Sequence, residues 1–336
     1  LMTNVGQTSN RGIELQLNAW LVETKDFSLN ATFNIGHNKN KIDKLASGEK
    51  EWILTSAWRN DVVNSDDYRA YVGGTSGLIY GYVNDGFYTV ADFEPFDSKS
   101  RSWKLKEGVV DSSPLSDTPR PGNAKFKKLT PVDPNSTNPY QLTEADRTVI
   151  GNTTPKFSGG FGLNATYKGF DMSMFFNFMY DFDVLNANKI MLTTWADNKE
   201  NNFLMNIASD KRWRNFDDMG NEIRYSPEVL AEFNKNATMW NPTSIGRPIC
   251  MSYAVEDGSF LRLNSATLGY TLPSVWTKKV GLSKVRFYVS GNNLFTLTGY
   301  SGYDPEVNIA TGLTPNIDYN RYPRSRTYTF GAQLTF

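Results

Sequence analysis

Residues able to perform covalent chemistry are scarce in this 336-residue chain, which holds one histidine, His37, and one cysteine, Cys250. A single histidine leaves no second imidazole for a two-histidine metal site. A single cysteine allows neither an intrachain disulfide nor a cysteine-based zinc site. His37 ends a segment of alternating polar and apolar residues, so we expect a surface or lumen histidine there and not a general base.

Two adjacent carboxylate pairs, Asp66-Asp67 and Asp217-Asp218, lie in polar segments, and we expect them to be solvated turn residues. The chain has no Walker-type motif and no GxGxxG motif, which removes the usual phosphate-binding loops. No nucleophile, base and orienting group can be identified together. We therefore expect no catalytic residue, no cofactor and no enzymatic activity.

Aromatic side chains are the more informative candidates for binding, because their faces stack on sugar rings and anchor protein interfaces. Five of them lie in long polar segments and are candidates for contact with a ligand or a partner protein, with packing inside the loops as the alternative: Trp195, Trp213, Trp240, Tyr300 and Tyr303. In one such segment Ser226 and Pro227 precede 228–233, which indicates a short capped helix that stiffens the loop.

The composition narrows the class of protein further. Lys and Arg number 35 and Asp and Glu number 35, so the electrostatic footprint of a nucleic-acid binder is absent. The mean hydropathy is −0.47, and no apolar run approaches the ~18 residues of a transmembrane helix. Yet 8 Trp, 17 Tyr and 21 Phe make up 14% of this polar chain, which indicates a use for the rings beyond a soluble core.

Strands with one apolar and one polar face account for this aromatic content. Apolar and polar residues alternate through 13–21, 27–36, 157–167, 170–180, 285–290 and 327–336. The clearest runs extend over about 11 residues, longer than the ~5–6 of soluble strands and close to the ~9–11 that cross a bilayer. The pattern favours an all-β protein with an antiparallel transmembrane β-barrel.

The connections between these segments are unequal. Two are tight, at Lys25-Asp26 and Lys168-Gly169, and three are long and polar, at 91–154, 182–258 and 296–324. Outer-membrane barrels combine short periplasmic turns with long extracellular loops. If both tight turns lie on one side, an even number of strands must lie between them, and we assign 68–74 and 78–88 to that pair.

The count is then about nine strands. Nine strands do not close a barrel of the usual even number, and an open edge in lipid leaves backbone groups unsatisfied at several kcal/mol each. We therefore expect residues 1–336 to be the C-terminal part of a larger barrel, with an N-terminal plug and the first strands absent.

The last strand ends on a free aromatic residue, Phe336, which resembles the terminal signal by which outer-membrane barrels are recognised for assembly. Arg321, Arg324 and Arg326 cluster where this strand would enter the outer leaflet. We expect them to pair with anionic lipid headgroups. The alternative is avoidance of the bilayer midplane, where a lipid-facing Arg costs ~2–4 kcal/mol.

Specific stretches of the chain resemble the SusC/RagA family of TonB-linked outer-membrane transporters. They follow the family's order through nearly the whole chain, at 10–14, 80–86, 146–160, 255–263, 268–270, 293–295, 300–306 and 323–336. The most specific are Asn293-Leu294-Phe295 and the Tyr-Ser-Gly-Tyr-Asp-Pro-Glu run of 300–306.

The resemblance implies a 22-stranded barrel with a plugged lumen in the outer membrane of a Gram-negative bacterium. It further implies import of oligosaccharides or peptides, with a SusD-like surface lipoprotein as lid and with energy supplied by TonB through the missing N-terminal part. The five loop aromatics would then face substrate or lid. The resemblance adds no catalytic residue.

One stretch departs from the family. Many members carry an Asp/Asn/Gly-rich loop resembling an EF-hand before the segment that begins at Asp146. Here Asp133 and Asn135 remain in 131–139, but the turn glycine is lost and three prolines intrude. We therefore expect no calcium and no other metal.

Two functions of other classes stay open at this point. One is an outer-membrane structural or adhesin barrel without active transport. The other is a secreted β-rich carbohydrate-binding module that would bury the apolar strand faces in a sandwich.

Overall fold

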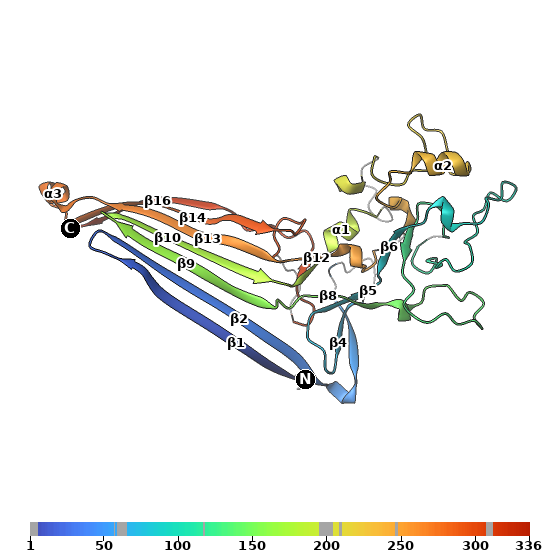
Figure 1. Ribbon diagram of the computed structural model, residues 1–336, viewed down its shortest axis with the longest axis horizontal. Helices are drawn as coiled ribbons and strands as arrows, with labels where there is room; N and C mark the ends of the chain where they lie inside the picture. The colour runs from blue at the N-terminus through green and yellow to red at the C-terminus, as the bar shows by residue number, and fades with distance from the viewer. Residues whose placement is uncertain are drawn as a thin grey trace.

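The computed structural model describes residues 6–56, 58, 66–116, 118–194, 204–207, 210–245, 248–306 and 312–336. A long antiparallel sheet forms one half of the molecule, and a loop region of short strands and helices is attached to one end of it (Figure 1). The strands of the long sheet are, in spatial order, β1 (Gly6–Glu23), β2 (Phe27–Leu45), β9 (Phe157–Tyr167), β10 (Phe170–Tyr180), β13 (Phe260–Thr271), β14 (Lys284–Thr298) and β16 (Thr327–Thr335).

The register of the long sheet places the apolar residues of every strand on one face. Leu17 pairs with Phe33, Phe33 with Phe161, and Phe161 with Phe176, so one apolar row crosses four strands. The rings of Phe161 and Phe176 stack with centroids 4.5 Å apart. The alternation in the sequence therefore predicts the faces correctly, because successive side chains of a strand point to opposite sides.

The opposite face of the long sheet is polar. Ser28, Thr166 and Asp171 stand opposite one another on β2, β9 and β10, and the row continues through Gly269 of β13 to Tyr288 of β14. The hydroxyls of Ser28 and Thr166 are 2.6 Å apart. One continuous apolar face and one continuous polar face are the pattern of a membrane-barrel wall.

Glycines on the polar face let large side chains lie against the backbone. Arg286 of β14 reaches across Gly269 to Asp171 of β10, with Nε donating to Oδ1 at 2.9 Å and Nη2 donating to Oδ2. The Tyr288 ring likewise covers Gly331 of β16, its cross-strand partner. In both places a Cβ would stand inside the space that the larger side chain fills.

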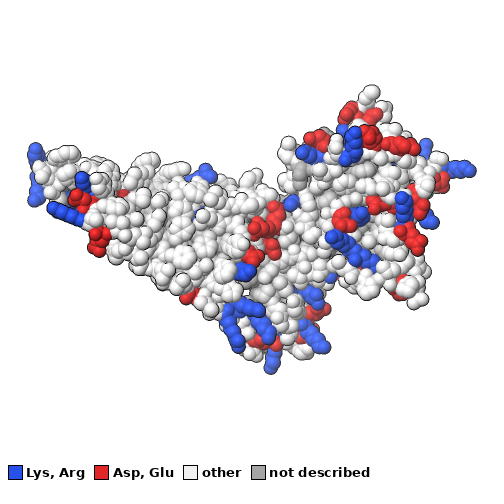
Figure 2. Space-filling model, viewed as in Figure 1, with Lys and Arg blue, Asp and Glu red and all other residues white. Residues whose placement is uncertain are grey.

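The apolar face is uncovered in the described residues. Ile13 is 78% exposed, Phe287 is 52% exposed and Phe330 is 80% exposed. Figure 2 shows few charged side chains on the long sheet between its two ends, and many on the loop region. An exposed apolar surface that extends over seven strands exceeds what a soluble monomer presents, which fits contact with lipid hydrocarbon.

The tight connections lie at one end of the sheet and the long ones at the other (Figure 1). β1 and β2 join through 24–26, and β9 and β10 join through Lys168 and Gly169, both with positive φ. The turn between β13 and β14 holds α3 (Ser274–Thr277), and the C-terminus lies at the same end. None of the helices in the described segments has the length and apolarity to cross a membrane.

The expected strand pair within 41–154 exists but does not belong to the long sheet. β4 (Asp66–Tyr71) and β5 (Leu78–Gly81) lie with β3 (Glu51–Thr55) and β8 (Thr148–Asn152) in a separate sheet of order β3-β4-β5-β8. With 6 and 4 residues they are too short to cross a bilayer. The long sheet thus has seven strands among the described residues, and β2 pairs directly with β9, which preserves the expected even parity.

The remaining elements build the loop region around several small apolar cores. Its other strands are β6 (Asn84–Phe87) with β7 (Ala124–Phe126), and β11 (Asp183–Asn186) between β12 (Val255–Asp257) and β15 (Ile317–Asp318). Its α-helices are α1 (Ala187–Met191) and α2 (Pro227–Phe233). The short 3₁₀ helices of the described segments are η1 (Ala46–Gly48), η2 (Val90–Asp92), η3 (Glu144–Asp146), η4 (Met205–Ile207), η5 (Pro242–Ser244), η6 (Ser252–Ala254) and η7 (Lys278–Val280).

We expect Gly269→Ala to lower the free energy of unfolding of the intact protein by about 1–3 kcal/mol, because the added methyl group displaces the Arg286 guanidinium from Asp171. Urea titration of the protein in lipid vesicles measures this change. Gly299→Ala is the matched control, since a Cβ there meets no atom within 4 Å. An equal loss from Gly269→Ala in an Arg286→Gln background would contradict the explanation.

Candidate functional site

An arginine-lined cavity of about 580 Å³ lies in the loop region. Its wall comes from stretches that are distant in sequence, together with Leu230 of α2: 101–103, 118–121, 123, 212–217, 224–225 and 241–244. The arginines on the wall are Arg101, Arg120, Arg212, Arg214 and Arg224.

A rigid segment forms one side of the cavity. Arg120 stands between Pro119 and Pro121, whose rings fix their own φ angles. The segment is held at Gly122, whose N–H donates to the carbonyl of Tyr88 at 2.7 Å and whose carbonyl accepts from the N–H of Asn241 at 2.8 Å. The exposed Arg120 therefore projects from a backbone that is fixed before any ligand arrives.

Trp213 supports the cavity from within the loop core. It is 3% exposed, lies against Gly122, and packs with Ile223 and with Leu230 of α2. The helix expected after Ser226 is present as α2, with Pro227 in its first turn, although the Ser226 side chain makes no capping hydrogen bond.

Positive charge is in excess on the wall of the cavity. Arg214 pairs with Asp218 at 2.8 Å, and Arg224 pairs with Glu222. In the described part of the chain, Arg101, Arg120 and Arg212 form no ion pair with a carboxylate. With Arg214 and Arg224 paired, the other three arginines face the single Asp217, so this wall carries an excess of positive charge in a chain that is neutral overall.

The one carboxylate on the wall is already engaged by its own turn. Asp217 accepts hydrogen bonds from the side chain and backbone of Asn221 and from the N–H of Met219, which lower its pKa. Burial and the neighbouring Arg214 lower the pKa of Arg212, whose Nη1 donates to the carbonyl of Ile207 at 3.3 Å. Arg101 and Arg224 lie over the Tyr225 ring at 5.3 Å and 5.7 Å.

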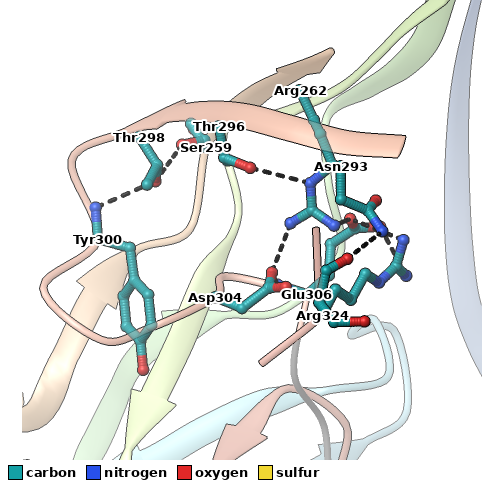
Figure 3. Close-up of polar contacts among 10 residues, drawn as sticks. Ser259, Arg262, Asn293, Thr296, Thr298, Tyr300, Asp304, Glu306 and Arg324 are labelled. Atoms are coloured by element: carbon teal, nitrogen blue, oxygen red, sulfur yellow. Dashed lines mark hydrogen bonds and ion pairs between the residues drawn. The ribbon is translucent and has the colours of Figure 1, made fainter. Parts of the chain in front are cut away.

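A second polar cluster joins the long sheet to the loop between β14 and β16. Arg262, 1% exposed, stands on β13 opposite Thr296 and donates to its hydroxyl at 3.0 Å. Its guanidinium pairs with Asp304 at 2.5 Å and with Glu306 at 2.7 Å. Figure 3 shows both carboxylates turned toward Arg262, with Arg324 on the far side of Glu306.

The same loop carries two of the expected aromatic residues in opposite environments. The Tyr300 hydroxyl donates to Asp318 at 2.7 Å, and the ring is 5% exposed among apolar residues. Burial raises the pKa of Tyr300 above its ordinary value. Tyr303 is 87% exposed and remains available to a ligand or partner.

Two more of the expected aromatic residues, Trp213 and Trp240, are buried. Trp240 is 2% exposed and packs edge-on against Tyr253, with ring centroids 4.8 Å apart. Trp213 is in the core beneath the arginine-lined cavity. Trp213, Trp240 and Tyr300 therefore pack inside the loops, which was the alternative to contact with a ligand or partner. Trp195 lies outside the described residues.

The three arginines expected to contact lipid headgroups differ in whether they have a protein partner. Arg324 is half-exposed and pairs with Glu306 at 3.4 Å. Arg321 and Arg326 are exposed and have no ion pair with a described residue, and they lie just before β16 at the loop end of the long sheet. Phe336, 89% exposed, lies at the opposite end, with the tight turns.

The carboxylate pairs behave differently from one another. Asp217 and Asp218 lie in an exposed turn, as expected. The expectation for Asp67 is wrong, because it is fully buried in β4 and accepts from the N–H of Ser56 at 2.7 Å. Burial raises the pKa of Asp67 to about 6, against the opposing effect of the Ser56 hydrogen bonds.

The motif residues Asp146 and Arg147 act as structural anchors. Asp146 accepts from the N–H groups of Leu129, Thr130 and Thr143 at 2.7–2.9 Å. Burial opposes ionisation of Asp146, but these bonds outweigh it and hold its pKa below the ordinary value. The Arg147 guanidinium lies 4.5 Å from the centroid of the Tyr80 ring, another motif residue.

The single histidine and cysteine have packing roles. His37 Nδ1 lies 2.6 Å from the carbonyl oxygen of Lys156, and its ring faces Phe157. Cys250 is buried, and burial raises the pKa of its thiol. Among the described residues no group of three or more His, Cys, Asp or Glu side chains could hold a metal ion.

The sequence reasoning missed the five arginines of the cavity and the role of Arg262. The cavity is assembled from stretches up to about 140 residues apart, which no local pattern reveals. Two local signals were available: Pro119-Arg120-Pro121-Gly122, which presents an arginine from a rigid turn, and Lys211-Arg212-Trp213-Arg214, a basic run around an aromatic residue.

Comparison with known proteins identifies relatives along the whole chain, although no model of a protein family matches it. The chain is 32% identical to the TonB-dependent receptor P3 of Formosa agariphila over 99% of its own length, and it covers 29% of that protein. It is 26% identical to the TonB-dependent receptor SusC of Bacteroides thetaiotaomicron, again over 99% of the chain, and covers 27% of SusC. The chain thus spans less than a third of the length of these relatives.

Solved structures share the fold. The chain superposes on the RagAB peptide transporter with a TM-score of 0.66 at 22% identity, covering 99% of this chain and 30% of that one. The 'open-open' state of the RagAB peptide importer gives a TM-score of 0.64 at 22% identity. The long sheet therefore has the fold of part of a transporter barrel.

We expect Arg262→Met to raise the rate of amide hydrogen exchange in 299–306 by an amount equivalent to about 3–5 kcal/mol of local stability, because Asp304 and Glu306 lose their buried cation. Arg69→Met is the control, since its ion pair with Glu51 is partly exposed and contributes ~1 kcal/mol or less. Unchanged exchange in 299–306 would show that Arg262 does not hold this loop.

Proposed function

Because the chain belongs to the SusC/RagA family of TonB-dependent receptors, we propose that it forms part of the pore wall and outer vestibule of an outer-membrane transporter. The division of the long sheet into one uninterrupted apolar face and one polar face is the observation that carries this proposal. The apolar face contacts lipid hydrocarbon, and the polar face lines the lumen. The chain performs no covalent chemistry in this role.

The location follows from the unequal ends of the sheet. The end with the tight turns and Phe336 faces the periplasm, and the loop region faces the outside of a Gram-negative cell. Phe336 serves there as the assembly signal. The loop region then lies where substrate first arrives, with Tyr303 exposed on it and Trp195 as a further candidate contact.

The complete receptor imports an oligosaccharide or a peptide, with a SusD-like lipoprotein as its lid and with TonB supplying the energy. The names of the relatives support this, since one is SusC and the structural neighbour is a peptide transporter. The structure does not favour a carbohydrate-binding β-sandwich, because no second sheet covers the apolar face in the described residues.

Deletion of TonB distinguishes an active transporter from a structural or adhesin barrel. We expect cells that depend on the receptor for a nutrient to lose uptake of that nutrient when TonB is deleted, while the receptor stays at normal abundance in the outer membrane. Uptake of a radiolabelled nutrient, before and after re-expression of TonB, measures this. Undiminished uptake without TonB would reject the transporter, and extraction of the receptor without detergent would reject the barrel.

The exposed arginines Arg321 and Arg326 pair with anionic headgroups of the outer leaflet in this arrangement, whereas Arg324 is engaged by Glu306. We expect Arg321→Gln with Arg326→Gln to lower the yield of folded receptor in membranes that contain lipopolysaccharide, because two charge-assisted contacts are lost. Arg324→Gln is the control for an arginine with a protein partner. An unchanged yield in the double variant would reject the lipid contact.

A further inference from the structure

The arginine-lined cavity is suited to a ligand that carries negative charge. Three of its five arginines have no carboxylate partner among the described residues, and Asp217 is satisfied by its own turn. Arg101 and Arg120 are exposed to solvent, so their guanidinium groups are open to the anionic groups of a ligand. Guanidinium groups bind carboxylates and sulfates through pairs of parallel hydrogen bonds.

The rest of the wall favours a ligand rich in hydroxyl groups. Phe216 is 47% exposed and offers a ring face on the cavity wall. Amide and hydroxyl side chains lie between the arginines: Ser102, Thr118, Asn123, Asn215 and Thr243. Aromatic faces stack on sugar rings, and short amide and hydroxyl side chains exchange hydrogen bonds with sugar hydroxyls.

A peptide is a poorer fit to the same wall. Extended peptides are commonly held by pairing with the edge of a sheet. None of the described residues that line the cavity belongs to a β-strand element of the chain, so the cavity offers no such edge. Its volume of about 580 Å³ is within the range of ligand sites and is large enough for a short oligosaccharide.

We propose that this cavity is a binding site for an anionic oligosaccharide, whose carboxylate or sulfate groups are bound by Arg101, Arg120 and Arg212 while a sugar ring rests on Phe216. The proposal rests on the proposed transport function, because it names the class of substrate that the transporter would bind at its outer vestibule. The site itself is already shaped: Pro119 and Pro121 fix the backbone at Arg120, and Trp213 and α2 support the floor.

Direct binding to the purified full-length receptor in detergent tests the proposal without transport. Isothermal titration would compare an oligogalacturonate tetramer, a sulfated carrageenan tetrasaccharide, neutral maltotetraose and tetraglutamate. We expect one or both anionic saccharides to bind at least tenfold more tightly than maltotetraose, with an affinity that falls as salt is raised. The carboxylated and sulfated probes distinguish the two sources of charge.

Variants that remove equal charge distinguish binding by the cavity arginines from attraction by the overall charge of the loop region. We expect Arg120→Gln with Arg212→Gln to weaken anionic saccharide binding by about 10- to 100-fold, since two charge-assisted contacts are lost. Lys104→Gln with Lys235→Gln removes the same charge from exposed positions outside the cavity and should change the affinity less than twofold.

Three results would overturn the proposal: equal affinity for neutral and anionic saccharides, equal losses in the two double variants, or tighter binding of tetraglutamate than of either anionic saccharide. The last would assign the cavity to acidic peptides. Each of these results leaves the TonB dependence of uptake unaffected, so failure of the cavity proposal is distinguishable from failure of the transport function.

Discussion

Backbone hydrogen bonding in a medium without water is the constraint on which the rest of this structure depends. In hydrocarbon every N–H and C=O must be paired within the protein, and a β protein meets this only with long strands that pair along their whole length. β9 and β10 meet this condition with 11 residues each, all paired in register. β4 and β5 cannot, and they lie instead in the loop region, where polar side chains, other backbone and solvent satisfy irregular segments.

Features encoded by neighbouring residues could be predicted from the sequence, and features assembled from distant ones could not. The alternation in 27–36 and 157–167 identifies the strands and their faces because a strand repeats every two residues. The turn at Lys168-Gly169 is equally local. Arg262 meets Asp304 across 42 positions, and the cavity joins Arg101 to Thr243, so both depend on how the loops fold back.

The assignment of 68–74 and 78–88 to the wall shows how a correct rule can select the wrong segments. Parity requires an even number of strands between the two tight turns, and zero satisfies it as well as two. Asp67, next to the first of these segments, is buried with a raised pKa, an environment that belongs in a protein core and not in a lipid-crossing strand. Its partner Ser56 is 11 residues away and gives no such signal in the sequence.

Glycine opposite a large side chain has a consequence for the space enclosed by the wall. Arg286 and Tyr288 lie along the sheet over Gly269 and Gly331, and so they extend parallel to the wall and do not project from it. If the polar face lines the pore as proposed, the pore keeps nearly the full bore of its backbone cylinder while its lining stays polar. Clearance for bulky cargo and polarity of the lining, which normally compete, are therefore obtained together.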